Sequence, residues 1–130
     1  MDARQLVNDF FIEQAAPAQT FSVNVALSSL KGAAEVDWTT CFERQCRKIP
    51  NDFDMKLCKG DCQWRSMNVL ITRINGLRAN CRKTANPTGC LKVLDNAVKA
   101  ERNSQRKVRE QMTQIRRQKE EFRRKEALRR

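Results

Sequence analysis

The chain has no histidine and no tyrosine, and only four glycines and three prolines among its 130 residues. Without histidine, the commonest general base and a frequent metal ligand are both missing. The glycine-rich phosphate-binding motifs and the nucleophile motif of the α/β-hydrolases are also absent. We therefore expect a protein that is not an enzyme and that has no small-molecule substrate.

Long apolar runs are missing as well. No stretch approaches the roughly eighteen apolar residues that a membrane-spanning helix needs. The N-terminus lacks a basic region followed by an apolar one, so either no signal peptide is present or the numbering starts after its removal. Scarce glycine and proline, with abundant leucine, alanine, arginine, lysine and glutamine, favour helix. The composition therefore predicts one small all-α protein.

Six cysteines in the middle of the chain are its most informative feature. An even, clustered set indicates either a disulfide framework or a thiolate metal site. The first four form two pairs, each about one helical turn apart, on either side of a bend at Pro50. Antiparallel packing of these two segments sets the inner cysteines opposite each other, and likewise the outer ones. The predicted disulfides, the third of them across the turn at 84–89, are Cys41–Cys62, Cys46–Cys58 and Cys81–Cys90.

Two alternatives stay open for these cysteines. Four thiolates suit tetrahedral zinc, which would be the only cofactor. Six reduced thiols acting as small apolar side chains would be ordinary for a cytoplasmic protein. Disulfides imply an oxidising compartment, which would be the mitochondrial intermembrane space, the periplasm or the extracellular space. The alternative zinc ligands are Cys41, Cys46, Cys58 and Cys62.

The nested pairing resembles the cysteine-stapled helical hairpins of mitochondrial intermembrane-space proteins, the twin C-x3-C and C-x9-C families. The resemblance covers residues 41–90 and concerns geometry alone. The intervening segments here contain four, three and eight residues. No family membership follows from it.

Amphipathic patterns predict several helices before the last turn. The expected helices cover 2–15, 22–34, 38–48, a short piece between 51 and 58, and 61–82. Asp37 and Asp61 are the expected N-caps of two of them. Whether Gly60 interrupts a longer helix that starts near residue 53 stays open at this point.

After the turn at 84–89, apolar residues at spacings of three and four predict a coiled-coil-like stripe on a helix of about 40 residues. Its first half is expected to pack against helix 61–82. Its second half is expected to project, because nothing upstream matches its length. Residues 99–130 contain 13 basic and 5 acidic residues, so this arm is strongly basic. The predicted partner-binding residues are Val108, Met112, Ile115, Phe122, Arg116, Arg117, Arg123 and Arg124.

The predicted organisation is an amphipathic segment at 1–34, a cysteine-stapled helical core at 35–98 and an extended basic helical arm at 99–130. With a formal net charge of +11, we expect an accessory or structural subunit of a larger assembly. Its basic helix would dock on an acidic or helical protein surface, or on an anionic membrane. The alternative function is a nucleic-acid-binding protein with a four-cysteine zinc module and a basic helical arm.

Overall fold

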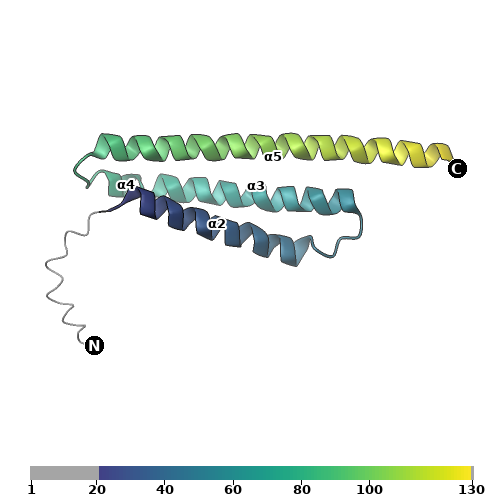
Figure 1. The fold of residues 1–130 in the computed structure, drawn as a ribbon, viewed down its shortest axis with the longest axis horizontal. Helices are drawn as coiled ribbons and strands as arrows, with labels where there is room; N and C mark the ends of the chain where they lie inside the picture. Colours follow the sequence, from purple (N-terminus) through teal and green to yellow (C-terminus); the bar gives the residue numbers. More distant parts are fainter. Residues whose placement is uncertain (1–20, 130) are drawn as a thin grey trace, which may run out of the picture.

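The computed structural model describes residues 21–129, which form helices and turns without a strand. Helix α2 spans Val23–Gln45, α3 spans Asp52–Gly76, the single turn α4 spans Arg78–Cys81, and α5 spans Pro87–Arg129. Figure 1 shows the three long helices side by side, with α3 between α2 and α5. The predicted all-α fold is confirmed, including the stapled hairpin and the long C-terminal helix. The helix predicted at 2–15 lies outside the described residues.

Helix α2 is longer than the sequence pattern indicated, because the helices predicted at 22–34 and 38–48 form one helix. Its N-cap is Ser22, whose hydroxyl accepts a hydrogen bond from the Val25 amide at 3.3 Å. Asp37 does not act as a cap. Its carboxylate lies across the helix pair, 3.4 Å from the Arg73 guanidinium on α3. Asp37 therefore ties α2 to α3 instead of starting a new helix.

Helix α3 is also continuous, and Gly60 lies within it. Asn51 caps its N-terminus by accepting a hydrogen bond from the Asp54 amide at 3.0 Å. Asp61, a predicted cap, is an interior residue that pairs with Arg65 one turn later at 3.0 Å. The helix predicted at 61–82 thus starts about nine residues earlier, at Asp52, and ends at Gly76.

Helix α5 contains 43 residues and is about 65 Å long at 1.5 Å per residue. Pro87 occupies its first position, and the Asn86 side chain accepts a hydrogen bond from the Gly89 amide at 3.0 Å. The helix runs antiparallel to α3 as far as Phe122, whose ring lies 5.7 Å from that of Phe53. Only its last turns extend past the end of α3 (Figure 1).

The expectation that the second half of α5 projects freely was therefore wrong. The reason is the uninterrupted α3, whose first turns supply the packing surface that a helix beginning at residue 61 would lack. Polar positions of the α5 stripe also find partners along α3. Gln105 donates from Nε2 to the Trp64 carbonyl at 3.2 Å and to Asn68 Oδ1 at 3.0 Å. Lys119 lies 2.6 Å from the Asp54 carboxylate.

The apolar core lies at one end of the molecule, where α2, α3, α4 and α5 meet. Ile74 and Leu94 are its largest fully buried side chains. Farther along the layer, α2 and α5 lie on opposite sides of α3. The predicted boundaries at 34/35 and 98/99 fall inside α2 and α5, so neither is a break in the helices. The core consists of Leu27, Ala34, Leu70, Ile74, Cys81, Cys90 and Leu94.

Candidate functional site

The first candidate site is the disulfide cluster that joins α2 to α3. The cysteines form the three predicted pairs, and none is free. Cα separations lie within the range that a disulfide requires, from 5.4 to 5.7 Å. In this structure the cysteines are neither the reduced thiols nor the metal ligands of the two alternatives. The disulfides, which indicate an oxidising environment, are Cys41–Cys62, Cys46–Cys58 and Cys81–Cys90.

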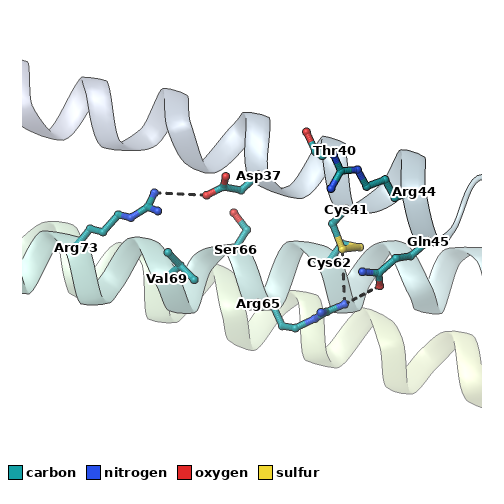
Figure 2. Close-up of a pocket in the computed structure, with 10 residues that line it drawn as sticks. All are labelled: Asp37, Thr40, Cys41, Arg44, Gln45, Cys62, Arg65, Ser66, Val69 and Arg73. Atoms are coloured by element: carbon teal, nitrogen blue, oxygen red, sulfur yellow. Dashed lines mark hydrogen bonds and ion pairs between the residues drawn. A yellow bond between two sulfur atoms is a disulfide. The ribbon is translucent and has the colours of Figure 1, made fainter.

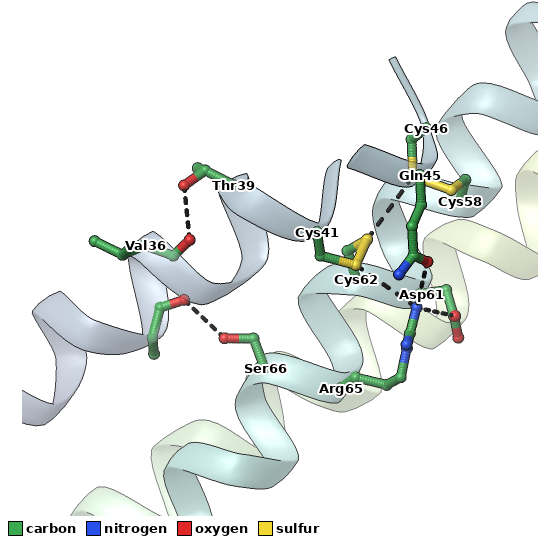
Figure 3. Close-up of a disulfide and its surroundings, with 11 residues drawn as sticks. Val36, Thr39, Cys41, Gln45, Cys46, Cys58, Asp61, Cys62, Arg65 and Ser66 are labelled. Atoms are coloured by element: carbon green, nitrogen blue, oxygen red, sulfur yellow. Dashed lines mark hydrogen bonds and ion pairs between the residues drawn. A yellow bond between two sulfur atoms is a disulfide. The ribbon is translucent and has the colours of Figure 1, made fainter. Parts of the chain in front are cut away.

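The two nested bridges contact each other, as Figure 3 shows. The sulfurs of Cys46 and Cys62, which belong to different bridges, are 3.8 Å apart. Both residues are buried, with 0 and 1% of their surface exposed. The Cys58 sulfur completes a group whose members all lie within 4.8 Å of one another. Their partners are half-buried, so each bridge has a buried inner end and an accessible outer end.

A pocket of about 360 Å³ opens beside the outer end of the Cys41–Cys62 bridge, between α2 and α3 (Figure 2). Arg65 enters it from α3 and places its Nη2 3.6 Å from the Cys41 sulfur. The same guanidinium lies 3.2 Å from Gln45 Oε1 and 3.0 Å from the Asp61 carboxylate. Arg44 and Arg73 also line the pocket. Two of these three arginines are paired with carboxylates, Arg65 with Asp61 and Arg73 with Asp37.

The apolar residues that were predicted to bind a partner lie instead in the interface between α3 and α5. Val108 is 8% exposed, and the Met112 side chain packs over Gly60, so neither forms a free docking surface. Ile115 is half-buried and lines a pocket with both of these residues. The Phe122 ring packs against that of Phe53 at an interplanar angle of 52°, but Phe122 keeps 51% of its surface exposed. The stripe is thus used within the chain, because α3 is long enough to cover it.

The arginines that were predicted to bind a partner divide into two groups. Arg116 and Arg123 belong to a set on α5 that recurs every seven residues. Such residues share one helix flank, and here this flank borders α3. Arg117 and Arg124 lie one residue farther along, about 100° around the helix. We call the seven-residue set the arginine row; its members, all exposed, are Arg102, Arg109, Arg116 and Arg123.

Most of the arginine row is not neutralised by the part of the chain that the structure describes. Between residues 21 and 129, no ion pair involves Arg102, Arg109 or Arg116. Arg123 lies 3.5 Å from Glu120, an exposed pair that contributes little. The row covers about 32 Å of helix, with about 10.5 Å between successive members. Because positions seven residues apart drift by about 20° around a straight helix, the row forms a slanted line of positive charge along α5.

Both tryptophans of the chain are half-buried and covered by a cation. The Arg109 guanidinium lies 5.1 Å from the centre of the Trp64 ring, and the Lys59 ammonium 5.7 Å from that of Trp38. Neither tryptophan belongs to the apolar core cluster. Trp64 borders the flank of α5 that holds the arginine row, and it holds Arg109 in place.

Sequence reasoning missed Arg65 and Gln105. Gln105 occupies a polar position in the apolar stripe of α5, and its partners on α3 depend on the antiparallel register of the two helices. Arg65 is three residues after Cys62 and so lies about one turn farther along α3. That spacing was the available signal. The spacing indicates a contact between Arg65 and the disulfide only when α2 is placed beside α3, because the Cys41 sulfur belongs to α2.

In comparisons with known proteins, no family model, no curated protein and no solved structure matches this chain. Among residues 21–129, no helix combines the length and apolar character needed to cross a bilayer. The disulfide cluster and the arginine row are therefore the two features of the molecule that bear on its function.

Proposed function

We propose that this protein is a non-catalytic subunit of a larger assembly, which docks through the basic flank of α5 on an acidic protein surface. The arginine row carries this proposal. Its guanidiniums stand at regular intervals on a helix that is braced by α3 over most of its length. A braced helix loses little conformational freedom on binding, so charge complementarity converts more fully into affinity.

The proposed docking residues keep Arg116 and Arg123 of the set predicted from the sequence and add Arg102 and Arg109. The apolar stripe is used internally, which leaves the exposed charge as the main feature available to a partner. The partner we propose presents carboxylates at intervals of about 10 Å, as a helix with acidic residues every seven positions does. Arginine suits such a surface, since its planar guanidinium binds a carboxylate through two parallel hydrogen bonds.

The three disulfides support an oxidising compartment for the proposed assembly. The compartments that we propose are the mitochondrial intermembrane space, the periplasm or the extracellular space. Phosphate-rich partners are the competing class, namely anionic membranes and nucleic acid. A sequence-independent phosphate binder loses affinity steeply with salt. Phe122 is the single aromatic residue of α5, so this helix offers no platform on which bases could stack.

A binding comparison with two charge-matched variants tests the proposal. The row variant replaces the four members of the arginine row with glutamine. The control replaces Lys107, Arg117, Arg124 and Lys125, all exposed elsewhere on α5, and removes the same net charge. The probes are a helical peptide with glutamates every seven residues, vesicles containing phosphatidylglycerol, and random-sequence duplex DNA, each at low and physiological salt.

We expect the peptide to bind the wild-type protein more tightly than the other probes at physiological salt. The row variant should lose about tenfold in affinity, corresponding to about 1.4 kcal/mol, and the control about twofold or less. Equal losses of affinity in both variants would mean that the row contributes only non-specific charge. Tighter binding of DNA or vesicles would support the phosphate-binding alternative instead.

A further inference from the structure

The nested disulfides gather four sulfur atoms at one place. The sulfurs of Cys46 and Cys62 are 3.8 Å apart although they are not bonded to each other. Those of Cys46, Cys58 and Cys62 all lie within 4.8 Å of one another. The fourth sulfur, of Cys41, is bonded to that of Cys62. No other part of the described chain brings three or more potential metal ligands so close together.

We propose that, once the two nested disulfides are reduced, the four thiolates bind a single Zn²⁺, so that the metal replaces the covalent links between α2 and α3. In a tetrahedral site with Zn–S bonds of about 2.3 Å, neighbouring sulfurs are about 3.8 Å apart. The sulfurs of Cys46 and Cys62 already have this separation. The ligands are Cys41, Cys46, Cys58 and Cys62.

The helices need little movement to complete the site. Two ligands come from the end of α2 and two from α3, and the bridged pairs have Cα separations of 5.7 and 5.5 Å. Breaking each bridge lets its two sulfurs separate by side-chain rotation, while the backbones stay in place. The ligands lie on both helices, so one ion would hold the hairpin closed as the two disulfides do.

The surroundings favour thiolates and give access to them. Four thiolates around one Zn²⁺ carry a net charge of −2, and the Arg65 guanidinium is 3.6 Å from the Cys41 sulfur. Cations nearby lower the pKa of a thiol. The nearby carboxylate of Asp61 is paired with the same arginine at 3.0 Å. The pocket beside Cys41 and Cys62 opens to solvent and provides the entry path.

The chemistry involves two separate reactions. A dithiol reductant gives two electrons and two protons to each disulfide and becomes a disulfide itself, leaving two thiols in the protein. Zn²⁺ then binds the four sulfurs, and up to four protons are released. Oxidation of the four thiolates by a disulfide oxidant reverses the sequence and expels the ion. A chain made in a reducing compartment has its cysteines as thiols at first, so the zinc form would precede the disulfide form.

The test uses the full chain, reduced with a water-soluble phosphine under anaerobic conditions in the presence of Zn²⁺. The phosphine takes its oxygen from water and yields two thiols per disulfide. The first variant, Cys81→Ser with Cys90→Ser, keeps the proposed ligands and removes the third disulfide. The second variant replaces the four proposed ligands with serine and keeps the third pair. Zinc affinity is measured by competition with a chromogenic chelator, proton release with a pH indicator, and coordination with Co²⁺ as a spectroscopic probe.

We expect the wild type and the first variant to bind one Zn²⁺ per chain, with up to four protons released and the Co²⁺ spectrum of tetrahedral thiolate coordination. The second variant should bind at least about a hundredfold more weakly. Circular dichroism should show helix content rising with zinc in the reduced wild type and the first variant, but not in the second variant. The oxidised wild type, without thiolates, should bind none.

Three results would overturn the proposal. The first is that the first variant, once reduced, takes up zinc no more tightly than the second variant. Alternatively, one ion binds two chains, so that the ligands do not come from one hairpin. Finally, zinc binds without any gain in helix, which removes its role in linking α2 to α3. None of these results bears on the arginine row, so the proposed function is tested separately.

Discussion

The two halves of α3 are stabilised in different ways. Its C-terminal half, with Ile74, lies where all the helices meet and where Leu94 of α5 is fully buried. Its N-terminal half has α2 on one side and α5 on the other, and the fully buried side chains there are Cys46 and Cys62. A three-helix junction buries apolar surface from several directions, whereas a flat layer cannot. Where the layer is flat, covalent links replace the missing core.

The largest expected effect comes from removing the links at the flat end. Replacing all four cysteines of the nested bridges with alanine should lower the free energy of unfolding by about 5 kcal/mol, from loop-closure entropy. Amide hydrogen exchange should rise most at the end of α2 and the start of α3, and least around Ile74. The Cys81→Ala and Cys90→Ala double variant, which loses one short loop, should lose about 3 kcal/mol. Uniform exchange along α3 would show that the two halves unfold together.

A core substitution should show the opposite pattern. Leu94→Ala removes a fully buried side chain at the junction and should destabilise the protein by about 2–5 kcal/mol, because a cavity remains. Val108→Ala, in the two-helix interface of the flat end, should cost about 1.5 kcal/mol. Denaturant unfolding of both variants with disulfides intact measures the difference. Equal costs would mean that the α3–α5 interface is packed as tightly as the junction.

The sequence predicted the disulfide pairs because cysteines about one turn apart share a helix face, and antiparallel apposition leaves a single nested arrangement. It also predicted the α5 stripe, since spacings of three and four residues are a property of one helix. The stripe depends only on local periodicity. The nested pairs needed in addition only the bend at Pro50, which sets two neighbouring segments antiparallel.

Features that depend on contacts between helices were not predicted. Asp37 and Asp61 resemble N-caps, yet their carboxylates pair with Arg73 and Arg65, and the helices continue through them. Gly60 resembles a helix breaker, but here it makes room for Met112 of α5. The length of α3, and with it the packing of the second half of α5, follows from that contact. The sequence around Gly60 does not reveal this contact, because Met112 belongs to another helix.

Alanine substitutions at two helical glycines should change the stability of the protein by smaller amounts and in opposite directions. A Cβ at Gly32 of α2 would meet nothing within 4 Å, so Gly32→Ala should stabilise the protein by about 0.5–1 kcal/mol through helix propensity. A Cβ at Gly60 would lie 2.8 Å from Met112 Cγ. That overpacking should outweigh the same propensity gain and leave Gly60→Ala destabilising by about 1 kcal/mol.

Thermal and denaturant unfolding of both glycine variants tests these signs. Combining Gly60→Ala with Met112→Ala separates the two contributions, because the shortened side chain relieves the overpacking. In the Met112→Ala background, Gly60→Ala should become neutral or stabilising. If it stays destabilising there, the glycine is needed for a reason other than space.

The smallest expected effect concerns the far end of α5, where Lys119 replaces an apolar residue in the stripe. Its ammonium lies 2.6 Å from the Asp54 carboxylate, and the two side chains are 33% and 42% exposed. Water and salt screen a pair so exposed, so a double-mutant cycle of Lys119→Gln and Asp54→Asn should give a coupling below about 1 kcal/mol. Asp54→Asn also weakens the favourable charge at the start of α3, a contribution that the cycle cancels. The coupling should decrease further in high salt. A salt-independent coupling above about 2 kcal/mol would instead mean that this ion pair, rather than the tilted packing of Phe122 against Phe53, holds the end of α5 on α3.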